Sequence, residues 1–318
     1  MRTYRTAAAV LIIAAVLNAR AFAVSDRAVD YLLKTAPRPA GMGGAFTAVP
    51  ADPIGMFWNP AAALRSDRLA ISGNHSLRHF PGPKKNLDQF NSDTTGITIP
   101  LQDDNVLGIG LTVPGEWGVD YTDTNGVLPV NEKLSGRERR AAYTGLHGQE
   151  QNGAAFGDSG WYRYNDRGGG TGYNSYPAGG GMSFFYEADN GMMYGVTVRG
   201  LLNRIKGVGA KKDGCVVTLG AAYRPDRNAS TLAATDLELS WKKNFETRWF
   251  AGAERAFDRR VFLRAGFMNG LPTYGFGAGF GSLRLDYAVV KKLLPEISGV
   301  KDVKKFGDGH FVSYTLSL

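Results

Sequence analysis

The chain has 318 residues, with 37 lysine and arginine residues against 29 aspartate and glutamate residues, 42 glycines and a single cysteine. One cysteine excludes a disulfide framework and a cysteine-rich metal site. The hydrophobic content of 43% is ordinary and argues against a disordered chain. The longest apolar run, residues 7–17, is too short for a membrane-spanning helix, which needs about 20 residues. The composition therefore excludes helical membrane proteins, and so much glycine does not favour a typical α/β enzyme.

Residues 1–23 have the pattern of a secretory signal peptide. Arg2 and Arg5 precede the apolar stretch, and Ala21 and Ala23 are the small residues that a signal peptidase reads. A buried N-terminal helix is the alternative interpretation. We expect cleavage after Ala23, which leaves an exported chain without a helical anchor. Such a chain is either a soluble β-protein or an outer-membrane β-barrel.

From residue 176 onward, apolar residues alternate with small or polar residues along a series of short segments. In one segment Leu283, Leu285 and Tyr287 share a face, and Arg284 and Asp286 share the opposite face. This period of two is that of β-strands with one apolar face. The sequence therefore predicts an all-β protein.

The second face of these segments carries charged residues in mid-strand. A soluble β-sandwich would expose this face to water, whereas a membrane barrel would turn it toward a polar lumen. Aromatic residues at the segment ends favour the barrel, because aromatic girdles lie at the two membrane interfaces. These aromatic residues are Tyr223, Trp241, Phe267, Tyr274, Phe280 and Tyr287. The charges predicted to face the lumen are Arg199, Asp236, Glu238, Glu254, Arg264, Arg284 and Asp286.

The connections between segments predict the strand number. With both termini in the periplasm, the short connections are periplasmic and the two longest, residues 114–175 and 290–309, are extracellular, as is usual for outer-membrane barrels. Twelve strands can be counted, and a further hairpin within residues 114–175, with Trp117 and Tyr121 as a candidate piece, would give 14. Alternation continues to Leu318, which suits closure of the last strand against the first.

The N-terminal region carries the most specific motifs. Residues 38–49 read Arg-Pro-Ala-Gly-Met-Gly-Gly-Ala-Phe-Thr-Ala-Val, and residues 57–61 read Phe-Trp-Asn-Pro-Ala. With the short helix expected before them, these motifs resemble the start of the PorV/PorQ family, which belongs with the FadL-like outer-membrane barrels. Residues 307–318 resemble the end of such chains. The resemblance implies a transmembrane antiparallel barrel of 14 strands, with residues 24–64 as a plug in the lumen and residues 65–318 as the barrel.

The plug motif has a structural interpretation. Glycines allow the backbone to approach the barrel wall closely, and an asparagine before proline is held extended or in a turn, where it can satisfy neighbouring backbone groups. We expect the motif to fix the plug to the wall, with direct ligand contact as the alternative. We expect glycines on the lumen face of the strands to leave room for the plug. The motif residues are Gly41, Gly43, Gly44, Asn59, Pro60 and Ala61.

Two patterns that resemble reactive sites are better explained by chance. Residues 157–160, Gly-Asp-Ser-Gly, resemble a serine-protease nucleophile segment in a polar loop, but no matching histidine and aspartate segments accompany them. His75 and His79 are expected to straddle a strand end and a loop, which does not suit a metal site. We therefore expect no enzymatic activity, no cofactor and no metal.

The expected partners follow from the barrel and from the resemblance. Basic loop residues such as Lys84 and Lys85 would pair with lipid phosphates or lipopolysaccharide at the rim, with plain solvated loops as the alternative. Nucleic acid is not expected for an exported chain. The resemblance implies a partner- or cargo-binding protein associated with secretion or envelope function in the Gram-negative outer membrane, which binds secretion-machine components or exported cargo. One alternative is a FadL-like channel for a small hydrophobic ligand. The other is a soluble exported β-sandwich binding protein.

Overall fold

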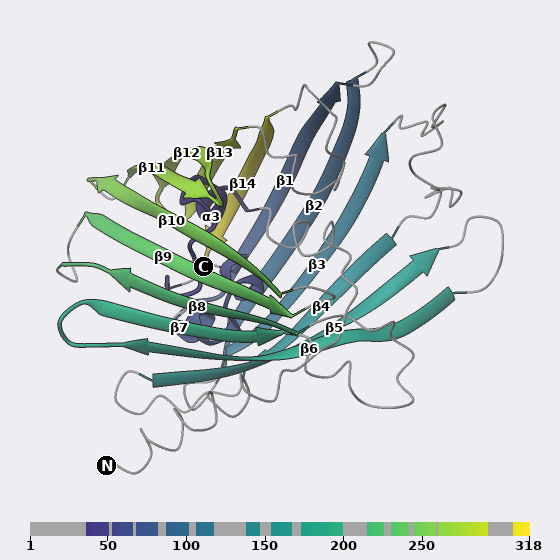
Figure 1. Ribbon diagram of the computed structural model, residues 1–318, viewed down its shortest axis with the longest axis horizontal. Helices are drawn as coiled ribbons and strands as arrows, with labels where there is room; N and C mark the ends of the chain where they lie inside the picture. The colour runs from purple at the N-terminus through teal and green to yellow at the C-terminus, as the bar shows by residue number, and fades with distance from the viewer. Residues whose placement is uncertain are drawn as a thin grey trace.

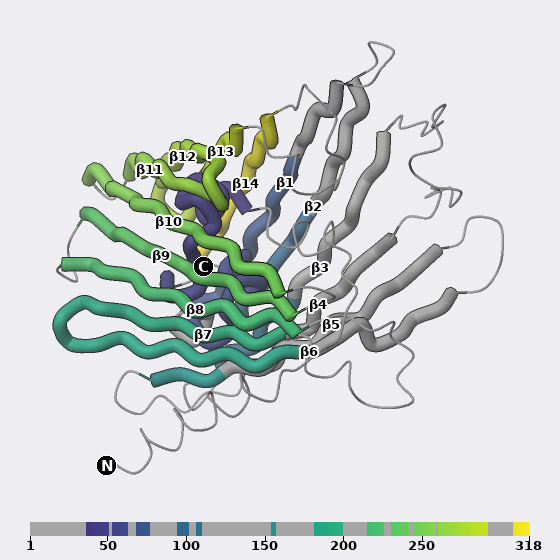
Figure 2. Tube along the Cα trace, in the orientation of Figure 1, coloured from purple at the N-terminus to yellow at the C-terminus, as the bar shows by residue number. Residues whose placement is uncertain are grey.

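The computed structural model describes most of the chain from residue 36 onward (Figure 2). The predicted signal peptide and residues 24–35 of the predicted plug lie outside the described residues. The described ranges are 36–50, 53–65, 68–81, 87–101, 106–117, 138–146, 154–166, 173–199, 215–225, 230–241, 245–258, 260–291 and 308–318.

Within these ranges, fourteen antiparallel strands close into a barrel (Figure 1). Each strand pairs with the next along the chain, and the last pairs with the first. The prediction of a 14-stranded antiparallel barrel is thereby confirmed, and the β-sandwich alternative is wrong. The strands are β1 (Ala70–Pro81), β2 (Leu87–Pro100), β3 (Val106–Trp117), β4 (Glu138–Leu146), β5 (Ala154–Asp166), β6 (Tyr173–Glu187), β7 (Met192–Arg199), β8 (Cys215–Tyr223), β9 (Thr231–Trp241), β10 (Phe245–Phe257), β11 (Val261–Met268), β12 (Leu271–Phe280), β13 (Leu283–Val290) and β14 (Gly309–Ser317).

The region predicted to hide a hairpin contains β4 and β5, which pair with each other. Three local predictions need correction. Trp117 ends β3 instead of belonging to the hairpin, and Tyr121 lies outside the described residues. Residues 157–160 lie in β5 and not in a loop. His75 and His79 both lie within β1. β3 and β5 run through glycines and a proline that favour turns, and β1 continues as far as Pro81.

The seam between β1 and β14 closes the barrel at the chain's last residues. Their register runs from Ala70 opposite Ser317 to Arg78 opposite Gly309, and the Leu318 N–H donates to the Leu69 carbonyl at 2.8 Å. On the outside, the ring of Tyr314 covers Gly73, where a Cβ would lie 2.5 Å from the ring. The seam therefore leaves no unpaired strand edge.

The barrel wall has an apolar outer face and a largely polar inner face. On β9 the inward residues Asp236, Glu238 and Ser240 are buried, whereas Leu237 is exposed on the outside. Large exposed apolar residues cover the outer face, among them Leu219, Tyr223, Phe267, Tyr274, Phe276, Phe280, Leu285, Tyr287 and Val312. A closed barrel with this distribution is a transmembrane β-barrel, because lipid demands apolar side chains and no open edge. Among the described residues, no helix is long and apolar enough to cross a membrane.

The connections differ in length between the two ends of the barrel. At the end where Leu318 lies, Gly281 and Ser282 alone join β12 to β13, and residues 188–191 join β6 to β7. At the opposite end, residues 118–137, 200–214 and 291–308 separate consecutive strands. Short periplasmic turns and longer extracellular connections are the usual arrangement, so we assign the end with Leu318 to the periplasm.

Phe276 lies in the middle of β12 and is exposed on the outer face. Phe276→Arg should destabilise the barrel in lipid by about 2–4 kcal/mol, because it places a charge at the bilayer midplane. The matched change Phe257→Arg, at the periplasmic end of β10, should cost about 0–1 kcal/mol. Denaturant unfolding in lipid vesicles measures both, and equal costs would contradict the assigned outer face.

Candidate functional site: the plug inside the barrel

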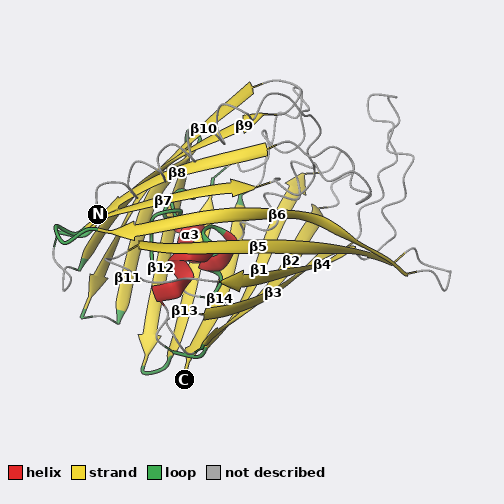
Figure 3. Cartoon of the chain, turned by 90° about the horizontal axis from the view of Figure 1, so that it is seen from below, coloured by secondary structure: helices red, strands yellow, loops and turns green. Residues whose placement is uncertain are grey.

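Residues 36–50 and 53–65, here called the plug, lie inside the barrel (Figures 1 and 3). The short helix α3 (Pro37–Gly41) packs against β11 to β14, and the 3-10 helix η2 (Pro60–Arg65) packs against β3 to β6. A second 3-10 helix, η1 (Gly55–Phe57), lies between them in the chain and packs on η2. The plug therefore contacts opposite arcs of the wall.

The interior of the plug is apolar. Its fully buried side chains include Met42, Phe46, Val49, Ile54 and Met56. The ring of Phe46 packs edge-on against that of Trp58, with a centroid distance of 6.0 Å. The inner wall is largely polar, so these plug residues form most of the apolar core inside the barrel.

Glycines let the plug backbone lie directly against the wall. Gly41 lies against Gly275 of β12, where a Cβ on Gly41 would come within 2.9 Å of the Gly275 Cα. Gly43 has a φ of +66° and lies against the β11 backbone at Phe267, so it combines a left-handed conformation with close approach. Five wall glycines face the plug backbone in the same way: Gly96, Gly195, Gly220, Gly252 and Gly266.

Two wall side chains bind the backbone of the first half of the plug. One carboxylate oxygen of Asp236 on β9 accepts the N–H groups of Phe46 and Thr47, each at 2.9 Å. The hydroxyl of Thr273 on β12 accepts the Gly43 N–H at 3.0 Å and donates to the Gly41 carbonyl at 3.1 Å. Both wall residues are almost fully buried, so these hydrogen bonds form away from bulk water.

Asn59 attaches the second half of the plug to β6. Its fully buried side-chain amide donates to the carbonyls of Thr47, at 2.6 Å, and Phe184, at 3.1 Å. Its carbonyl oxygen accepts the Ala61 N–H at 3.0 Å, and that N–H also lies 3.0 Å from the Ser183 hydroxyl. Pro60 opens η2 directly after Asn59. The contacts of Asn59 are therefore with protein backbone, which favours the structural role expected for the motif.

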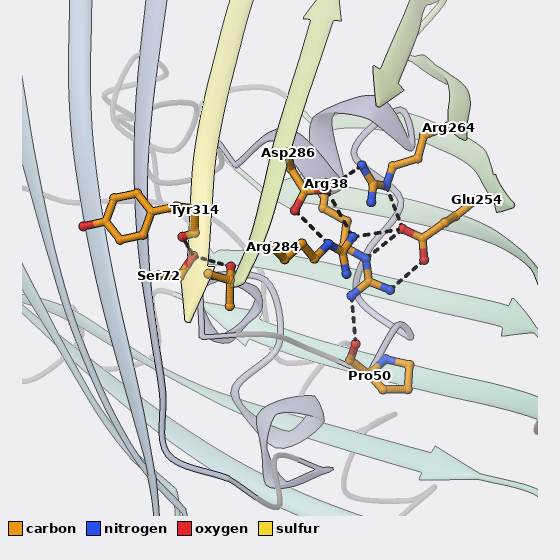
Figure 4. A network of polar contacts seen from close by, with 9 residues as sticks. Arg38, Pro50, Ser72, Glu254, Arg264, Arg284, Asp286 and Tyr314 are labelled. Carbon is orange, nitrogen blue, oxygen red and sulfur yellow. Dashed lines mark hydrogen bonds and ion pairs between the residues drawn. The ribbon is translucent and has the colours of Figure 1, made fainter. Parts of the chain in front are cut away.

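A buried ionic cluster, here called the latch, joins α3 to the wall (Figure 4). Arg38 of the plug forms a bidentate pair with Glu254 of β10, at 2.9 and 3.0 Å. Arg264 of β11 bridges Glu254, at 2.6 Å, and Asp286, at 2.8 Å. Arg284 of β13 pairs with Asp286 at 2.9 Å. Bidentate pairs of this kind fix geometry as well as charge, so the latch sets the position of α3.

A second ionic group lies on β7, β9 and β10. Arg199 of β7 pairs with Glu238 of β9 at 3.0 Å, and Arg248 of β10 approaches Glu238 at 3.6 Å and Glu246 at 3.8 Å. With this group, all seven charges predicted to face the lumen lie on the inner face of the wall; Arg284 is half-buried and the other six are buried.

Sequence reasoning missed Arg38, although a charge count contains the signal for it. The seven predicted lumen charges are three arginines and four carboxylates, so the count indicates a further cation. Arg38 of the plug and Arg248 of the wall both pair with these carboxylates. Thr273, Ser183 and Arg248 were also missed, because their residue types are common on inner faces of barrels.

The extracellular rim carries one described ion pair at the ends of the last long connection. Lys291 pairs with Asp308 at 2.6 Å, and this hydrogen bond raises the pKa of the exposed Lys291 ammonium. Next to it, the Tyr287 hydroxyl lies 2.7 Å from Nδ1 of His310. The basic loop residues Lys84 and Lys85 lie outside the described residues, so their pairing with lipopolysaccharide stays a prediction.

The 14-stranded barrel with a plug in its lumen is similar in fold to solved outer-membrane channels, among them a FadL homologue. The Pseudomonas putida toluene transporter TodX is 12% identical, with 88% of this chain and 96% of that chain covered and a TM-score of 0.56. The Ralstonia pickettii toluene transporter TbuX is 14% identical, covering 91% and 100% of the two chains, with a TM-score of 0.59. A Pseudomonas aeruginosa FadL homologue is 12% identical, covering 89% and 98%, with a TM-score of 0.55.

These likenesses extend over nearly the whole of each chain, and at such low identity they show the fold alone. The first of the similar structures are channels or transporters and not enzymes. No protein-family model and no curated protein sequence matches the chain. The comparisons support the FadL-like fold and give no support to the PorV/PorQ branch in particular.

The latch predicts a specific effect of Arg38→Met. This change removes the bidentate partner of Glu254 from the plug, while Arg264 still pairs with Glu254 in the wall. Each of the two lost charge-assisted hydrogen bonds is worth about 1.5–3 kcal/mol, so their loss should unseat α3 and leave the barrel closed. Single-channel recording in planar bilayers should show a larger ion conductance than in the unmodified protein.

Arg248→Met is the matched control for this experiment, because it removes a half-buried guanidinium that pairs with wall carboxylates. It should leave the conductance close to that of the unmodified protein. Equal conductance of the Arg38→Met variant and the unmodified protein would contradict the claim that the latch holds α3 in the lumen.

Proposed function

We propose that the protein is an outer-membrane channel for small hydrophobic molecules, closed at rest by its N-terminal plug. The observation that carries the proposal is the likeness of nearly the whole chain to channels for such molecules, described as toluene transporters and a monoaromatic hydrocarbon channel. The plug contacts support it, because a hydrophobic-molecule channel must remain closed to water and ions. In this proposal residues 24–64 form the plug and residues 65–318 form the barrel.

The geometry of the plug suits this task. Its two halves are attached to different arcs of the wall, α3 through the latch and Asn59 through β6. Between these attachments, Asp236 binds the backbone of Phe46 and Thr47. Movement of one attachment does not require release of the others, so a passing molecule could be admitted by local displacement of the plug.

The role in secretion implied by the PorV/PorQ resemblance stays a prediction. The residues that carry the resemblance, such as Gly43 and Asn59, seat the plug in the barrel. A plug is needed by a closed channel and by a partner-binding barrel alike, so these residues do not separate the two roles. The comparisons support the channel better. Co-purification of secretion-machine components or exported cargo from solubilised membranes would support the secretion role instead.

Uptake of radiolabelled toluene tests the channel function. Expression in a Gram-negative host that lacks its own hydrocarbon channels should raise the initial uptake rate several-fold, because lipopolysaccharide retards hydrophobic solutes. Sensitivity of the same cells to a large hydrophilic antibiotic should not change, which controls for a general leak. An uptake rate equal to that of cells with the empty vector would contradict the proposal.

A further inference from the structure

The inner wall of β7, β8 and β9 carries polar side chains that do not take part in the plug contacts described above. Thr197 and Arg199 lie on β7, Thr218 on β8, and Glu238 and Ser240 on β9; together they are called the polar ledge. Thr197 is directly opposite Thr218, and Thr218 is directly opposite Glu238. Directly opposed residues on one face have Cβ atoms about 4.5–5.5 Å apart, so the ledge is one continuous patch.

Several polar atoms of the ledge lack hydrogen-bond partners. Among the described residues, the hydroxyls of Thr197, Thr218 and Ser240 and the Nε of Arg199 are buried and unpaired. The exposed fractions of these residues are 2%, 2%, 5% and 9%. A buried polar group without a partner is destabilising, and proteins contain few such groups. Four on three neighbouring strands indicate that the patch has a partner in another state of the protein.

The ledge begins where the plug contact ends. Gly195 of β7 and Gly220 of β8 lie against Thr47 of the plug, and Thr197 and Thr218 are the next inward residues toward the extracellular end. A molecule that arrives from the extracellular side therefore meets the ledge directly before the plug. Because the unpaired atoms are covered in this structure, it reaches them only after a local movement, such as displacement of the neighbouring segment around Thr47 from the wall.

Among the described residues beside the ledge, the charges of one ionic group balance. Arg199 and Arg248 are paired with Glu238 and Glu246, so two cations face two anions in this group. A charged ligand would disturb this balance, whereas a neutral group would not. The unpaired hydroxyls can both donate and accept, and the guanidinium Nε–H can donate. This set of donors and acceptors matches a neutral hydroxyl group, which itself donates and accepts.

We propose that the polar ledge binds the hydroxyl group of a small apolar molecule, so that the channel takes phenols and alcohols in preference to the corresponding bare hydrocarbons. The proposal rests on the channel function proposed above and adds the substrate class. Binding pairs the unpaired atoms of the ledge, and this gain favours the displacement of the plug segment around Thr47. A bare hydrocarbon forms no hydrogen bonds with the ledge.

Competing uptake of p-cresol and toluene, which differ by one hydroxyl, tests the proposal in the expression host described above. The unmodified protein should favour p-cresol over toluene by about 2- to 10-fold after correction for cells without the protein, the value of one neutral hydrogen bond. Thr218→Val keeps the volume of the side chain and removes the hydroxyl. It should bring the ratio close to one by slowing p-cresol and leaving toluene unchanged.

Thr247→Val, on the outer face of β10, is the matched control and should leave the ratio unchanged. Heat-modifiable gel mobility should show that both variants fold. Equal uptake rates for p-cresol and toluene would contradict the proposal that the polar ledge binds a hydroxyl group, and so would a p-cresol preference that is unchanged in Thr218→Val. Both results would leave the proposed channel function intact. If the protein accelerates neither solute, the channel function itself fails, and the ledge proposal fails with it.

Discussion

The ion pair between Arg38 and Glu254 connects the two parts on which the structure depends, the plug and the wall. Both side chains are buried, where an unpaired charge costs several kcal/mol. Glu254 also pairs with Arg264 of the wall, so one carboxylate joins the plug to β11. The position of α3 in the lumen therefore depends on charges of the wall.

The remaining contacts of the plug depend on glycines on the inner face of the wall strands. A glycine such as Gly252 or Gly266 weakens a strand, because it has no side chain to pack. On the inner face this loss is offset where the plug backbone lies against the bare strand, as at Met42 and Gly43. The high glycine content of the chain is therefore a property of the interface between plug and wall.

Much of the fold could be predicted from the sequence, because the alternation along each strand indicates which side chains face lipid and which face the lumen. Leu283, Leu285 and Tyr287 had to face the lipid, so Arg284 and Asp286 had to face the lumen. The strand ends were harder to place, because β3 and β5 extend through glycines and a proline that usually mark turns. The position of Arg38 could not be read from periodicity, because the plug follows no regular period and its contacts are distant in sequence.

The same limits apply to the function. The plug motif, with Gly43 and Asn59, identified a plugged barrel but did not separate a channel from a secretion partner, because both need a seated plug. The distinction depends on side chains scattered over several strands, such as Thr197 and Thr218, which come together only in the closed barrel.

Hydrogen–deuterium exchange of the full protein in lipid nanodiscs tests the central claim most directly, that the plug is fixed to the wall by buried contacts. A peptic fragment that covers residues 42–49 contains the N–H groups of Gly43, Phe46 and Thr47, which bind Thr273 and Asp236. The account predicts that these amides exchange as slowly as those of the strands. Exchange within seconds, as in an unstructured peptide, would contradict it.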